Sequence, residues 1–152
     1  LDINKLTASG LGLRSSLDDD LTSSYAYALY YFNETAFRFV LGKDASVQLQ
    51  SLINEQQLRY DIDYVMRDDL SALTLSGEQA FDALVDSFKL TPGLRLSDMR
   101  SCYGAQSGEV FITAIDNQAT QQFQLVARQA ELDKWQTHLQ QLGFDLALAN
   151  VA

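Results

Sequence analysis

Cysteine, histidine and proline are nearly missing from this sequence, each occurring once in 152 residues. The single cysteine, Cys102, excludes an intramolecular disulfide and a zinc site built from several cysteines. The single histidine, His138, needs carboxylate partners to hold a metal, and the sequence alone does not identify them. Glycine-rich nucleotide loops, the zinc-protease motif and the serine-hydrolase motif are also missing. We therefore expect a protein that is not an enzyme, with no catalytic residue, no metal and no cofactor.

One enzymatic alternative rests on Cys102, which follows a predicted strand, as the nucleophile does in some cysteine peptidases. Such a thiol needs a neighbouring base to form the thiolate. Families with this arrangement supply the histidine from upstream of the cysteine, whereas His138 lies downstream. We expect Cys102 to behave as a small apolar side chain at the end of a hairpin.

Basic residues are few, with 11 Lys and Arg against 20 Asp and Glu, and the formal net charge is −9. They are scattered singly, whereas a surface that follows a phosphate backbone needs several of them together. Nucleic acid and anionic membrane surfaces are therefore not expected partners. A protein with a basic surface would be attracted.

Long hydrophobic runs are also missing. No apolar stretch reaches the roughly 18 residues of a membrane span, so we expect no membrane insertion within this chain. The chain begins at Leu1 and not at Met. Whether an upstream signal or anchor has been removed is therefore left open.

The composition is that of a globular protein, with 47% hydrophobic and 20% charged residues. A chain of this length can bury a core without disulfides or metals. No repeat, low-complexity tract or linker divides it. Residues 1–152 are therefore expected to form a single α/β interaction domain.

Two amphipathic helices are predicted, over residues 76–89 and 130–142. Apolar side chains recur in them every three or four residues and form one stripe that requires cover. Ser76 and Gln79 form a capping-box pattern at the start of the first helix. A third helix is predicted over residues 44–58, with Asp44 or Ser46 as its cap.

Strands are predicted where apolar residues are continuous or alternate. Residues 109–116 are apolar on both faces and indicate a central strand covered on both sides. Alternation at period two predicts half-buried strands over residues 60–66, 122–128 and 144–148. Shorter alternating stretches, residues 73–75 and 94–97, predict further strands. The helices of residues 76–89 and 130–142 are expected to pack on the same sheet.

Residues 17–41 have two interpretations. Ser16, the aspartates Asp18, Asp19 and Asp20, and the closing Gly42 are typical of a helix with its start and end marked, and apolar residues between them follow a 3.6 period. A hairpin that turns at residues 33–35 competes with this helix, because the flanking segments are aromatic and alternate in part. We favour the helix. The expected fold class is α+β, a single mixed sheet with two or more helices packed on it, preceded by a long aromatic-rich helix.

Three segments carry a resemblance to a known family: ASVQLQSLINEQQLRYDIDYV, LTLSGEQAFDALVDSF and GEVFITA. Residues 45–114 resemble the short N-terminal (N0-like) module of secretins and TonB-dependent transducers, in which a helix, an extended segment, a second helix and a hairpin follow one another. The resemblance implies a non-catalytic, periplasmic docking module. It carries over no site residues.

We therefore expect a protein–protein interaction module of a bacterial envelope system, for secretion, pilus assembly or uptake, in the periplasm or associated with the envelope. The alternative is an acidic cytoplasmic binding protein, such as a secretion chaperone or a toxin-immunity protein. Self-association into a homo-oligomer is left open.

The predicted partner site is the strand over residues 60–66 with the residue that follows it, because a charged edge strand resists pairing with its own copies and stays available to a chosen partner. The residues expected to bind the partner are Tyr60, Asp61, Asp63 and Arg67.

Overall fold

The computed structural model describes residues 3–33, 35–77, 79–90, 101–114, 122–144 and 146–150. Its elements are, in chain order, a 3-10 helix η1 (Ile3–Lys5), β1 (Leu11–Ser16), β2 (Ala26–Asn33), β3 (Ala36–Leu41), α1 (Lys43–Gln56), β4 (Leu70–Ser76), α2 (Ala80–Phe88), β5 (Ser101–Ser107), β6 (Val110–Ala114), β7 (Gln122–Arg128), α3 (Gln129–Gln141) and β8 (Leu146–Asn150). The predicted strand over residues 94–97 lies outside the described residues.

The strands form one curled sheet in the order β3-β2-β1-β5-β6-β7-β4-β8. The expected α+β class, with helices packed on a single sheet, is confirmed. The expectation of a mixed sheet is wrong, because every pairing among the described strands is antiparallel. Short connections such as those of the β2–β3 and β5–β6 hairpins return the chain beside itself and so favour antiparallel neighbours. The predicted central strand is confirmed as β6, which lies between β5 and β7.

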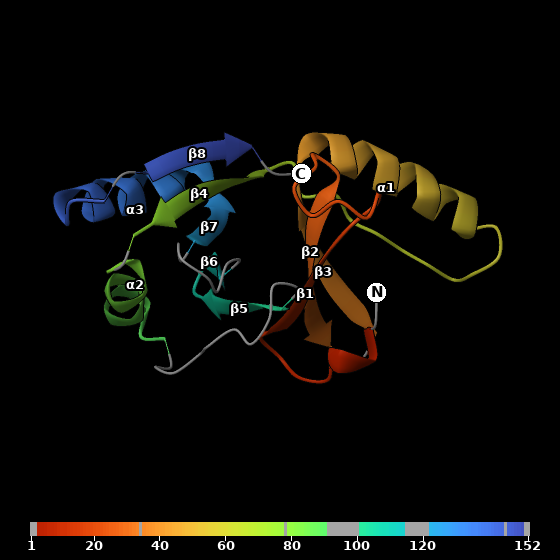
Figure 1. Cartoon of the computed structure of the whole chain (residues 1–152), viewed down its shortest axis with the longest axis horizontal. Coiled ribbons are helices and arrows are strands. Elements are labelled where there is room, and N and C mark those ends of the chain that lie inside the picture. The colour runs from red at the N-terminus through yellow and green to blue at the C-terminus, as the bar shows by residue number, and fades with distance from the viewer. Residues whose placement is uncertain are drawn as a thin grey trace.

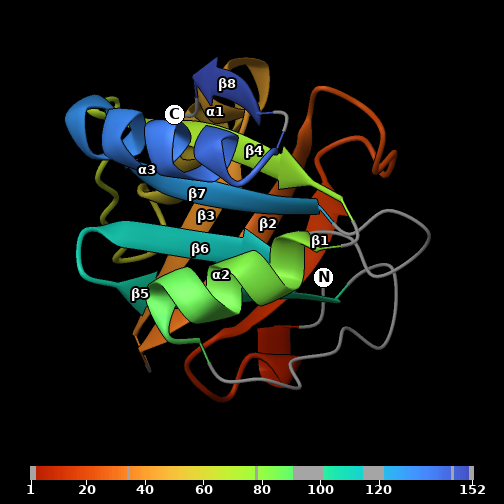
Figure 2. The same ribbon diagram turned by 90° about the vertical axis from the view of Figure 1, so that its left-hand side faces the viewer.

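Helices α2 and α3 cover one face of the strands β6, β7 and β4, as Figure 2 shows. Their buried side chains Leu84, Leu132 and Leu139 are fully enclosed against the sheet, and Phe88 packs on Trp135 with ring centroids 4.0 Å apart. The prediction that both helices pack on the same sheet is confirmed. The stripe of apolar residues carried this prediction, because a helix with such a stripe needs a sheet face to cover it.

The start of α2 differs from the predicted capping box. Ser76 is the last residue of β4, and Gln79 occupies the N-cap position without a side-chain capping bond. The helix therefore begins at Ala80. At the other end Lys89 adopts a left-handed conformation, with φ of 56°, and ends the helix.

The opposite face of the sheet is concave, because β1, β2 and β3 turn across the other strands (Figure 1). A second, smaller core fills this face. In it Tyr30 meets Phe111 edge to face, with ring centroids 5.1 Å apart, beside Cys102 and Val126. We call this group the concave core, and it includes Ala28 and Ala72 as well.

The long helix predicted for residues 17–41 is wrong, and the competing hairpin forms. The aspartates hold a turn instead of a helix start: Asp18 accepts hydrogen bonds from the Ser23 hydroxyl at 2.8 Å and from the Asp20 N–H at 3.2 Å. Short side chains that bond to nearby backbone compete with helix in this way. Residues 26–41 then pair as β2 and β3, with an irregularity between Tyr31 and Asn33.

The strand predicted for residues 60–66 is also wrong. These residues belong to an irregular connection between α1 and β4, and among the described strands none pairs with them. Tyr64 is tied to α1 instead, because its hydroxyl accepts a hydrogen bond from Gln50 at 2.9 Å and donates one to Asn54 at 3.2 Å. The period-two alternation of apolar residues in this segment therefore occurs without pairing to a described strand.

Candidate functional site

A groove of about 1050 Å³ runs along β3. All residues of β3, Ala36–Leu41, line it. Since β3 is the last strand of the sheet, its outer edge has no partner among the described strands. An edge strand of this kind presents unpaired backbone N–H and C=O groups. We call this cavity the β3 groove.

The opposite wall of the β3 groove comes from α1 and the connection that follows it. Leu49 and Ile53 of α1 line the groove, together with residues 63–67. Figure 1 shows α1 extending away from the sheet, with this connection returning beneath it. Only Ala45 and Ser46 of α1 are buried. The wall is therefore attached to the sheet mainly at one end of the helix.

The floor of the groove is the concave core. Tyr30, Gly104, Phe111 and Val126 contribute to it. Gly104 lets the two rings lie close to β5, because a Cβ there would overlap Phe111 Cζ and lie 3.0 Å from Tyr30 Cδ1. The floor is thus aromatic and closely packed.

Arg38 is the notable charge in the groove. Its guanidinium carbon lies 4.3 Å from the centre of the Phe111 ring and 5.5 Å from that of Phe32, both within cation–π range. Its Nη1 donates to Gln106 Oε1 at 3.1 Å. Burial lowers the pKa of the Arg38 guanidinium, and the nearby charge of Arg67 adds to this effect. Among the described residues, no carboxylate forms an ion pair with Arg38.

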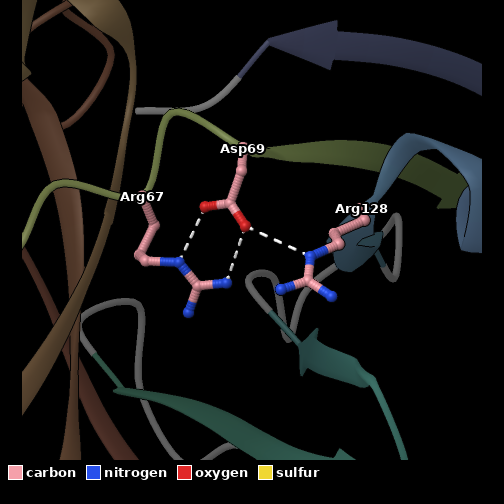
Figure 3. Close-up of polar contacts among 3 residues, drawn as sticks. All are labelled: Arg67, Asp69 and Arg128. Atoms are coloured by element: carbon pink, nitrogen blue, oxygen red, sulfur yellow. Dashed lines mark hydrogen bonds and ion pairs between the residues drawn. The ribbon is translucent and has the colours of Figure 1, made fainter.

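Arg67, a second arginine of the groove, is neutralised by Asp69 (Figure 3). Its Nε and Nη2 donate to the two carboxylate oxygens at 2.7 and 2.9 Å, and Arg128 Nε approaches from the opposite side at 3.3 Å. Hydrogen bonds from Arg67 hold the pKa of the Asp69 carboxyl well below its usual range. This network joins the connection before β4 to the end of β7.

The predicted partner residues are only partly brought together. Asp63 and Arg67 line the β3 groove, whereas Tyr60 and Asp61 are exposed on the connection and do not. Sequence reasoning missed Arg38 and the aromatic residues of β3. The alternating aromatic pattern of the hairpin interpretation was the signal that could have identified them.

A second hollow, of about 930 Å³, lies between α2 and α3. Acidic side chains Asp82, Asp86 and Glu131 line it, and Lys134 binds Glu131 at 2.8 Å. His138 is exposed here and meets Trp135 edge to face.

Cys102 and His138 are not brought together. Cys102 lies in the concave core, while His138 belongs to α3 on the other face of the sheet. Burial raises the pKa of the Cys102 thiol to about 11, so the group is a thiol at neutral pH. Within the described ranges, no group of three or more His, Cys, Asp and Glu residues could hold a metal ion. No helix in the same ranges is long and apolar enough to cross a membrane.

No protein-family model matches the chain, and no solved structure matches it.

Proposed function

We propose that this chain is a non-catalytic protein-docking module that binds an extended segment of another protein in the β3 groove. The observation that carries this proposal is the position of the open edge of β3, which forms one wall of a groove of about 1050 Å³. A segment lying there would add a strand to the sheet. Backbone hydrogen bonds supply affinity in this mode, and pockets for alternate side chains supply selection.

Exposed apolar side chains around the groove support this proposal. Val65 is 82% exposed, Phe32 57% and Phe37 39%, and all three line the groove. Clustered apolar groups that face solvent are typical of interaction sites, whereas single ones are ordinary. The aromatic residues would cover alternate side chains of the bound segment.

We further propose that the module acts in a bacterial envelope system. Over residues 43–114 the described elements follow the order helix, strand, helix and hairpin, as in the N-terminal modules of secretins and TonB-dependent transducers. The net charge of −9 favours a partner whose surface is basic beyond the docking segment, because such charge steers association over a distance.

The alternative function is an acidic cytoplasmic binding protein, such as a secretion chaperone or a toxin-immunity protein. The hollow between α2 and α3, with Asp82, Asp86 and Glu131, favours this alternative because its carboxylates suit a basic partner. If this alternative holds, the double variant Asp82→Lys with Asp86→Lys abolishes partner binding. If the partner instead docks in the β3 groove, the same variant binds it as the wild type does.

The test uses random displayed peptides about ten residues long, the upper length of an ordinary strand. We expect the domain to enrich peptides with apolar residues at alternate positions. Val65→Ser and Phe37→Ser should weaken their binding about tenfold each in calorimetric titration, as the loss of a central apolar contact does. Val47→Ser is the matched control, because Val47 is 61% exposed but lies outside the groove.

Equal weakening by Val47→Ser, or enriched peptides without alternation, would contradict docking in the β3 groove. Protection of β3 amides from hydrogen exchange on peptide binding is expected in addition. If the free domain elutes as a dimer and the Phe37→Ser variant elutes as a monomer, then a second copy of the chain, and not a foreign segment, occupies this edge.

A further inference from the structure

We propose that Arg38 selects the docking segment by binding an acidic side chain within it, so that the occupant of the β3 groove carries a carboxylate flanked by apolar residues. This inference rests on the proposed function and names the chemistry of the partner. It follows from the contacts of the Arg38 guanidinium, from the charges around it and from the apolar character of the groove.

Counted against the residues that the structure describes, the Arg38 guanidinium has unused donors. It carries five N–H groups in a planar fork, and its only side-chain acceptor among the described residues is Gln106 Oε1, bonded through Nη1. Phe111 and Phe32 contact the guanidinium through their rings. Aromatic rings leave the N–H groups in the guanidinium plane without acceptors. A carboxylate can accept two of these bonds side by side.

The other charges of the groove do not satisfy Arg38. Arg67 is already held by Asp69 through two hydrogen bonds. Asp63 and Glu109 line the same cavity, yet neither forms an ion pair with Arg38. The half-buried cation therefore lacks a counter-charge in the described part of the chain. A cation that is partly removed from water without a partner favours an incoming anion.

A purely structural role would leave the choice of ligand unchanged. Arg38 could simply close the concave core by resting on Phe111, and Arg38→Gln would then reduce stability without altering which peptides bind. The two roles differ in their dependence on ligand charge. The experiment must therefore change the charge of the ligand and of the protein together.

The experiment pans the same displayed peptides against the wild type, Arg38→Gln and Arg59→Gln. Arg59 is the matched control, because it is exposed and does not line the groove. We expect the wild type and Arg59→Gln to enrich aspartate or glutamate at one fixed position between apolar residues. Arg38→Gln should keep the apolar alternation and lose the acidic position.

Synthetic peptides make the result quantitative. Replacing the acidic residue of an enriched peptide by its amide should weaken binding to the wild type about tenfold, the usual scale of a lost charge pair in a partly desolvated site. The same replacement should change binding to Arg38→Gln less than about twofold. Arg38→Lys keeps the charge without the fork and should give an intermediate loss. Circular dichroism melting shows whether each variant is folded.

The outcomes separate the two proposals. Alternating peptides without an acidic preference, or an acidic preference that survives in Arg38→Gln, overturn the role of Arg38 and leave docking in the β3 groove intact. Peptides without alternation, or no enrichment at all, overturn docking and the role of Arg38 with it. If Arg38→Gln does not fold, the ratio of acidic to amide peptide affinity in Arg38→Lys decides, and an unchanged ratio overturns the inference.

Discussion

Gly104→Ala tests whether the floor of the β3 groove depends on close approach of two rings to β5. The new Cβ would overlap Phe111 Cζ and lie 2.8 Å from Phe111 Cε2 and 3.0 Å from Tyr30 Cδ1. Tyr30 is 1% exposed and Phe111 8%, so both rings are closely surrounded by other side chains. Overpacking of such a site costs about 1 to 3 kcal/mol. The smaller entropy of unfolded alanine returns about 0.4 to 1 kcal/mol. The middle of both ranges gives a net loss of roughly 1 to 2 kcal/mol.

Urea denaturation followed by the fluorescence of Trp135, the only tryptophan, measures this loss. With a slope of about 2 kcal/mol per molar urea, the middle of the usual range for small proteins, the midpoint should fall by roughly 0.5 to 1 M. Gly42→Ala is the matched control, because the nearest atom to its added Cβ is Ser24 O at 3.8 Å. Phe111→Leu should relieve part of the overlap, so that the double variant with Gly104→Ala loses less than the sum of the two changes. An equal midpoint for Gly104→Ala and Gly42→Ala would refute the reasoning.

Three further predictions concern the helix layer, the thiol and the acid network. Leu84→Ala should lower the free energy of unfolding by about 2 to 5 kcal/mol, because Leu84 is a fully buried residue of α2. The control Val47→Ala, at an exposed position, should change it by less than about 0.5 kcal/mol, and urea titration measures both variants. A thiol-reactive reagent should label folded Cys102 slowly at neutral pH, since burial raises the pKa of the thiol to about 11, and rapid labelling without urea would count against this. The pKa of Asp69 is lowered from 3.8 by hydrogen bonds from Arg67, so its contribution to stability is present above pH 3.8 and is lost as the pH falls below it. Asp69→Asn should flatten the acid limb of a stability-versus-pH curve slightly, and an unchanged acid limb would argue against the pairing.

The sequence by itself determined the elements whose side-chain period allows one interpretation. Residues Leu84, Phe88 and Leu132 lie on helical stripes, and this spacing identifies both the helix and its buried face. The continuous apolar run of β6 likewise indicated a central strand, because a short run without a polar face is typical of a strand covered on both faces. These features are local, so a single chain segment contains all the information they need.

Only the tertiary structure decided between helix and hairpin in residues 17–41. The turn signals at Asp18 and the aromatic alternation of β2 compete over the same residues, and the pairing of β2 with β1 resolves the competition. The opposite case is Tyr64, whose alternating neighbours find no strand partner and whose hydroxyl binds α1. Alternation indicates the ability to form a strand, whereas a strand requires a neighbour that the local sequence cannot supply.

The β3 groove also belongs to the tertiary structure. Its lining joins Arg38, Phe111 and Val126, which are far apart in the chain and meet because the sheet curls over its concave core. Nothing in the local pattern around Arg38 distinguishes it from an ordinary solvated arginine. Its surroundings of aromatic rings and an amide acceptor arise only when the strands that carry them are brought together. Burial, and the lack of a counter-charge among the described residues, are properties of the assembled surface.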